Sequence, residues 1–141
     1  MAPELSRHGR FSTKSDIYSY GVMVLEIVTG EQISKFEESS RAMSLVDYVW
    51  KHWNAKAALA VVDPYMSNEY QREDAVKSIQ VGLLCVQSDP VKRPSMQEVL
   101  VMLHNNRESL PVPSNPGYLS QHLIFPLKST TDEALISEEM P

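Results

Sequence analysis

The sequence has 141 residues, of which 43% are hydrophobic and 22% charged, a composition typical of one soluble globular domain. The net charge is -5 and no basic cluster is longer than Lys92-Arg93, which argues against a nucleic-acid-binding protein, because such proteins carry a basic surface for phosphates. The apolar stretch 21–25 is far shorter than the roughly 20 residues of a membrane-spanning helix, so we expect no membrane segment.

A long helix is predicted between residues 13 and 30. Thr13 and Asp16 have the spacing of a capping hydroxyl and an acid, a pair that satisfies free backbone N–H groups at a helix start. Gly30 indicates the end. Apolar residues recur between them at intervals of three and four; these are Ile17, Tyr20, Val24, Ile27 and Val28. Further apolar residues lie on the other faces, so we expect this helix to be mostly buried.

Three more helices are predicted downstream. Ser44 precedes an amphipathic stretch over 45–54, and the pair Ser95 and Glu98 begins another over 95–104. Between them, apolar periodicity predicts a helix over 72–87, which Asp89-Pro90 ends. A short helical turn is expected within 55–62, and no strand or internal repeat is found. The sequence therefore predicts an all-α body.

The composition changes near residue 105. Five of the nine prolines lie beyond it, among Ser, Thr and acidic residues, a pattern that favours disorder. We therefore divide the chain into a folded body, 1–104, and a mostly disordered Pro/Ser/acidic tail, 105–141.

No catalytic, cofactor-binding or metal-binding residue is predicted within the chain. The five glycines are too dispersed to form a phosphate-binding loop. The four histidines lie far apart, without cysteine or acidic residues at ligand spacing. Cys85 lies in the apolar run 82–86, where a thiol usually serves as a small core residue.

Four motifs occur in a specific order: Met1-Ala2-Pro3-Glu4, the stretch 14–21, the run 82–86, and Asp89-Pro90 through Met96. In this order they resemble the second half of the large lobe of a eukaryotic protein kinase, from the Ala-Pro-Glu motif onward. The segments 45–53, 62–64 and 82–87, together with the tail, are similar to plant receptor-like Ser/Thr kinases of the cysteine-rich and S-domain type. The implied fold is the helical C-terminal half of the large lobe, followed by the tail.

The resemblance implies roles for four residues. Glu4 would form a buried structural ion pair with Arg93, which offers a carboxylate two parallel donors; the alternative is that Glu4 is a solvated acid at a frayed end. Asp16 would anchor the catalytic loop of an intact kinase, whereas in this chain alone it serves as a helix-start acid. Gly21 would permit close helix packing.

Trp50 and Trp53 lie three residues apart on one predicted helix. They form either a surface for protein partners or part of the core and its grooves.

A protein kinase needs a glycine-rich loop, a Lys–Glu pair, a catalytic aspartate and a magnesium-binding aspartate. All of these precede the Ala-Pro-Glu motif, so we expect this chain alone to be inactive. The intact parent would use ATP and Mg²⁺ to phosphorylate protein Ser/Thr in signalling. It would span the plasma membrane once, with this soluble part on the cytoplasmic side. The alternative is a truncated, non-catalytic interaction module that binds another kinase or regulator.

Overall fold

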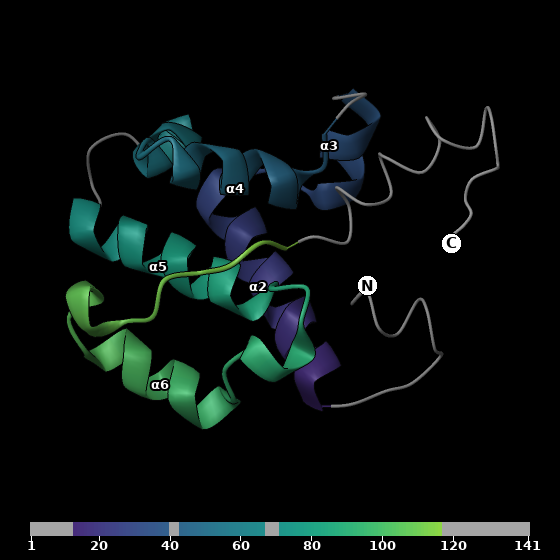
Figure 1. The fold of residues 1–141 in the computed structure, drawn as a ribbon. Helices are drawn as coiled ribbons and strands as arrows, with labels where there is room; N and C mark the ends of the chain where they lie inside the picture. Colours follow the sequence, from purple (N-terminus) through teal and green to yellow (C-terminus); the bar gives the residue numbers. More distant parts are fainter. Residues whose placement is uncertain (1–12, 40–42, 67–70, 117–141) are drawn as a thin grey trace, which may run out of the picture.

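The computed structural model describes residues 13–39, 43–66 and 71–116 (Figure 1). The helices within these ranges are α2 (Thr13–Thr29), α3 (Ile33–Ser39), α4 (Leu45–Asn54), α5 (Arg72–Cys85) and α6 (Met96–His104). Short 3-10 turns lie at η1 (Ala58–Val61), η2 (Pro64–Met66), η3 (Pro90–Lys92) and η4 (Arg107–Ser109). These ranges contain no strand, and the predicted all-α fold is confirmed.

The helix ends follow the local chemistry of the sequence. Gly30 has a φ of 74°, a left-handed conformation that glycine adopts without a Cβ clash, and it ends α2. The Ser44 hydroxyl accepts a hydrogen bond from the Asp47 backbone amide at the start of α4. Ser95 and Glu98 form a reciprocal capping box at the start of α6. The end of α2 and the starts of α4 and α6 are therefore set by the residues from which they were predicted.

Two details differ from the sequence prediction. The helix α3 was not predicted; its first amide, on Ile33, donates to the Glu26 carboxylate of α2 at 2.8 Å, and Phe36 lies against the Tyr48 ring of α4. The helix α5 ends at Cys85 rather than at Gln87. The first difference arises from contacts between elements, which local periodicity does not encode.

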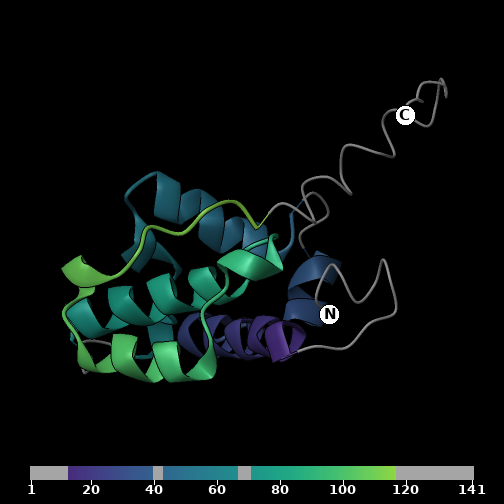
Figure 2. The ribbon, with the colours of Figure 1, turned by 60° about the horizontal axis from the view of Figure 1, so that its bottom comes forward.

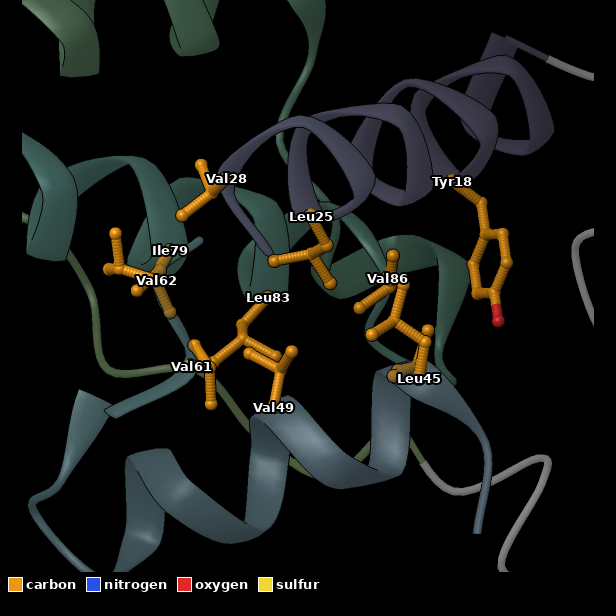
Figure 3. Packing of buried hydrophobic residues seen from close by; sticks show 11 residues of the cluster. Tyr18, Leu25, Val28, Leu45, Val49, Val61, Val62, Ile79, Leu83 and Val86 are labelled. Carbon is orange, nitrogen blue, oxygen red and sulfur yellow. The ribbon is translucent and has the colours of Figure 1, made fainter. Parts of the chain in front are cut away.

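The main core lies where α2, α4 and α5 meet. Leu25 of α2, Leu45 and Val49 of α4, and Ile79 of α5 are each 0% exposed, and Figure 3 shows their side chains converging from the three helices. Burying one such side chain stabilises a fold by roughly 1.5–3 kcal/mol. In both ribbon views, α5 lies between α4 and α6 (Figures 1 and 2).

A smaller cluster attaches α6 to this framework. It consists of buried residues from α2, α5, α6 and the segment after η4, namely Ile17, Val81, Cys85, Val99 and Leu110. The final helix is therefore held by apolar contacts to both α2 and α5.

Residues 110–116, which we call the strap, run along α5 (Figures 1 and 2). Its residues Leu110, Pro113 and Pro116 are buried, a spacing of three that matches the three residues per turn of polyproline II. Gln80 of α5 donates to the Pro111 carbonyl at 2.8 Å. Packing therefore extends past the predicted boundary at residue 104; residues 117–141 lie outside the described ranges.

Candidate functional site

Arg93 is the most deeply buried charged residue among those described, with 1% of its surface exposed. It follows η3 and lies two residues before Ser95, the first residue of the α6 capping box. Its Nε donates to the Gln87 carbonyl at 2.7 Å, and its two terminal nitrogens donate to the carbonyls of Lys14 at 3.0 Å and Ser88 at 3.4 Å. A buried guanidinium requires such acceptors, because removing it from water without them is costly.

The same arginine holds the start of α2. Its guanidinium carbon lies 5.0 Å from the centroid of the Tyr18 ring, a favourable cation–π distance. Lys14 in turn donates from its ammonium group to the Arg93 carbonyl. The first turn of α2 and the loop before α6 are thus joined in both directions, although 79 residues separate Lys14 from Arg93.

The ion pair between Glu4 and Arg93 stays a prediction, because Glu4 lies outside the described residues. Arg93 does occupy the kind of position that the resemblance requires: it is buried, beside the N-terminal end of α2, and ringed by hydrogen-bond acceptors.

Asp16 lies in the first turn of α2 and is exposed. Negative charge there interacts favourably with the positive end of the helix dipole. Met23 and Ile27 follow on the same face of α2, with 49% and 63% of their surfaces exposed. This Asp16 face, defined by Asp16, Met23 and Ile27, is an apolar stripe with one acid at its N-terminal end.

Gly21 lies at the crossing of α2 and α5. A Cβ added there would stand 2.6 Å from the Cys85 Cβ and 2.9 Å from the Gly82 carbonyl oxygen. Gly82 faces α2 from the other helix, where an added Cβ would meet the Leu25 side chain at 2.8 Å. The two helices therefore approach more closely at Gly21 than any residue with a side chain allows.

Trp50 and Trp53 are both half-buried, and both pack against the main core. Trp53 also lines a groove of about 590 Å³ between the end of α4, η1 and α5. Core and groove packing, one of the two sequence interpretations, describes their contacts; their use as a partner surface stays a prediction.

Cys85 is a free, fully buried thiol, as expected from its apolar neighbours. Burial raises its pKa to about 12, and the charge of Arg93 opposes this shift. The thiol is therefore protonated and unreactive near neutral pH. Within the described ranges, no three His, Cys, Asp or Glu side chains gather as metal ligands, and no helix has the length and hydrophobicity of a membrane span.

Comparison with known proteins gives a consistent picture. Residues 1–103 match the family model described as protein tyrosine and serine/threonine kinase. The chain belongs to this protein kinase family. Its similarity to two Arabidopsis thaliana proteins extends over nearly the whole sequence: cysteine-rich receptor-like protein kinase 8, 48% identical over 94% of this chain, and cysteine-rich receptor-like protein kinase 6, 43% identical over 100%.

A solved kinase-like structure has the same fold. The pseudokinase domain of BIR2, an immune regulator of the RLK/Pelle family, aligns with a TM-score of 0.64 and 30% identity, over 74% of this chain and 31% of that one. The chain spans about a fifth of the length of the two Arabidopsis relatives. The predicted resemblance to receptor-like kinases is confirmed.

Two residues of this site were missed by sequence reasoning. Gln87 joins α5 to the loop before α6 through its side-chain amide, which donates to the Leu84 and Lys92 carbonyls. Lys14 binds the Arg93 carbonyl. Both residues lie in stretches that the motifs include, but Lys14 binds a partner 79 residues away and Gln87 also binds Ser114, 27 residues away, so their roles depend on the tertiary fold.

Proposed function

We propose that this chain is the C-terminal helical segment of the kinase domain of a plant receptor-like Ser/Thr protein kinase. The observation that carries the proposal is the buried Arg93, which ties the start of α2 to the loop before α6 inside a region that matches the kinase family model over residues 1–103. In this proposal the segment is a scaffold for the lobe and does no chemistry alone.

The intact parent would transfer the γ-phosphate of ATP to protein hydroxyls with Mg²⁺ as cofactor. The residues of this chain do not fit either group: its described part has no cluster of metal-ligating side chains, and its glycines form no phosphate loop. Binding and catalysis would therefore belong to the preceding part of the kinase domain. Its protein substrates would be recognised there as well.

The Asp16 face is consistent with a preceding part of the kinase domain that packs against this chain. Met23 and Ile27 expose much of their surface, although α2 packs closely against α5 on its other side. In the intact domain, preceding segments would cover this face, and the Asp16 carboxylate would accept hydrogen bonds from the catalytic loop. The parent would place the domain on the cytoplasmic side of a single membrane span.

The alternative of a non-catalytic interaction module is not favoured. The relatives reported above are receptor-like kinases by name, and both Trp50 and Trp53 pack on the core. If Trp53 still contributes to a surface for protein partners, Trp53→Ala should weaken the binding of such a partner to this chain.

A chimeric kinase tests the proposal. Residues 1–141 would replace the matching region of cysteine-rich receptor-like protein kinase 8, and phosphate transfer from ATP·Mg²⁺ to casein would be measured beside the unaltered domain and the chain alone. We expect activity from the chimera and none from the chain. A folded, monomeric chimera that is inactive beside an active unaltered domain would refute the proposal.

Asp16→Asn makes the test specific. Because Asp16 is exposed here, the substitution should change the stability of the isolated chain by no more than about 0.5 kcal/mol. In the chimera, loss of the loop anchor should lower activity at least about tenfold, which corresponds to roughly 1.4 kcal/mol of transition-state stabilisation. Asp74→Asn is the matched control, since Asp74 is also an exposed acid in a first helical turn. Equal activity of the two variants would contradict the role of Asp16.

A further inference from the structure

A small set of polar contacts fastens the strap to α5 and to the turn that follows it. Gln80 binds the Pro111 carbonyl, and the Ser88 amide donates to the Asn115 carbonyl at 3.2 Å. Ser114 makes two further bonds: its amide and its hydroxyl both donate to the Gln87 Oε1, at 2.9 and 2.8 Å. The buried face of the strap is apolar, so these bonds fix its register along the helix.

All the hydrogen-bonding positions of the Gln87 side-chain amide are used. Its Nε2 donates to the Leu84 carbonyl at 2.9 Å and the Lys92 carbonyl at 2.8 Å, while its Oε1 accepts both Ser114 donors. Turning the amide over would place its oxygen against two carbonyl oxygens. The side chain therefore accepts only a hydrogen-bond donor from residue 114.

The surroundings of Ser114 offer little compensation for added negative charge. Gln87 lies just beyond the C-terminus of α5, where the helix dipole is negative. Arg93 is close in sequence, but it is buried with its Nε on the Gln87 carbonyl. Lys92 is exposed, and an ion pair between a phosphate and a solvated lysine would stabilise the bound strap only slightly.

We propose that Ser114 is a phosphorylation site whose modification releases the strap from α5. The phosphoryl donor would be ATP, delivered by a protein Ser/Thr kinase in trans. The Ser114 oxygen forms a bond to the γ-phosphorus, the bond from that phosphorus to the bridging oxygen of ADP breaks, and the hydroxyl proton passes to the base of that kinase. This inference does not depend on whether the parent of this chain is itself active.

Phosphorylation of Ser114 would remove its hydroxyl hydrogen bond to Gln87 and would add repulsion between the two side chains. It removes the hydroxyl donor and replaces it with three acceptor oxygens carrying nearly two negative charges at neutral pH. These oxygens would face the Gln87 Oε1 and the negative end of α5. Because Ser114 is half-buried and bonded when the strap is bound, the transferring kinase would modify the detached strap and thereby trap it.

Hydrogen exchange tests the release. Phosphoserine would be installed at position 114 of the 141-residue chain, with phosphoserine at position 109 as the matched control, because Ser109 is exposed and bonds only locally, to the Asn106 carbonyl. The bonded amides of Ser88 and Ser114 should exchange at least about tenfold faster only in the first protein, as expected for losing two or more net hydrogen bonds. Unchanged exchange, or equal loss of protection throughout α2 and α5, would overturn the proposal.

A labelling experiment tests whether the site is used. The unmodified chain would be incubated with ATP·Mg²⁺ and the catalytic domain of cysteine-rich receptor-like protein kinase 8, and phosphoserines would be mapped by mass spectrometry. Phosphate should appear on Ser114, several-fold faster in Gln87→Leu, which loosens the strap. Phosphate on other serines with none on Ser114 in either protein would overturn the assignment.

Discussion

The crossing of α2 and α5 gives a quantitative prediction for Gly21→Ala. The new methyl carbon would stand 2.6 Å from the Cys85 Cβ, 2.9 Å from the Gly82 carbonyl oxygen and 2.9 Å from the Val86 Cγ1. The first two neighbours are fixed to the α5 backbone and cannot rotate away. The helices must therefore separate to near ordinary van der Waals distance, and that separation disturbs the core on both sides.

Two opposing effects set the magnitude. Replacing glycine by alanine inside a helix favours folding by about 1 kcal/mol. Overpacking a well-filled core costs about 1–3 kcal/mol, and contacts against backbone belong at the upper end. We expect a net loss of about 2 kcal/mol. Gly82→Ala is the matched control, because its Cβ would meet the end of the Leu25 side chain; its net effect should stay within about 1 kcal/mol of zero.

Urea unfolding of the 141-residue chain, followed by helical circular dichroism, measures both variants. The expected order of stability is Gly82→Ala well above Gly21→Ala. If Gly21→Ala were as stable as the original or more so, the close approach of α2 and α5 would be wrong.

Three further predictions concern other contacts. Arg93→Ala leaves three carbonyls without their donor and should cost about 3–5 kcal/mol in urea unfolding; a cost below about 1 kcal/mol would contradict the buried position. The folded Cys85 thiol, with its pKa raised to about 12, should resist alkylation at pH 8, and rapid alkylation at that pH would contradict its burial. Because the unfolded thiol ionises near pH 9, the free energy of unfolding should fall as the pH rises from about 9 to 12. The exposed apolar stripe of Met23 and Ile27 should make the isolated chain self-associate, and replacing both residues by Lys should reduce this association in sedimentation; a chain that associates equally with and without the two substitutions would exclude the Asp16 face as the cause.

Local sequence signals predicted most of the helical framework. Ser44, Ser95 and Gly30 act on their own chain neighbours, so their effect is visible in the sequence. The α3 helix was missed because its first amide binds Glu26 of another helix. The strap was missed because prolines and serines suggest disorder, whereas the glutamines that hold it lie elsewhere in the sequence, Gln80 on α5 and Gln87 just beyond its end.

The site was predictable only through the resemblance to kinases. Lys92 and Arg93 are adjacent cations, yet Lys92 is exposed and Arg93 is 1% exposed, and no charge pattern distinguishes them. Gly21 was expected to allow close packing, but its partner Cys85 lies 64 residues away along the sequence. Such roles depend on which elements meet, and that information is not local.

A double-mutant cycle between Glu4→Gln and Arg93→Gln tests the central claim most directly, namely that the beginning of this chain closes onto the loop before its last helix. Unfolding free energies of the four proteins give the coupling between the two side chains. A buried carboxylate–guanidinium pair predicts a coupling of at least about 1.5 kcal/mol. Additive effects, with a coupling below about 0.3 kcal/mol, would contradict it.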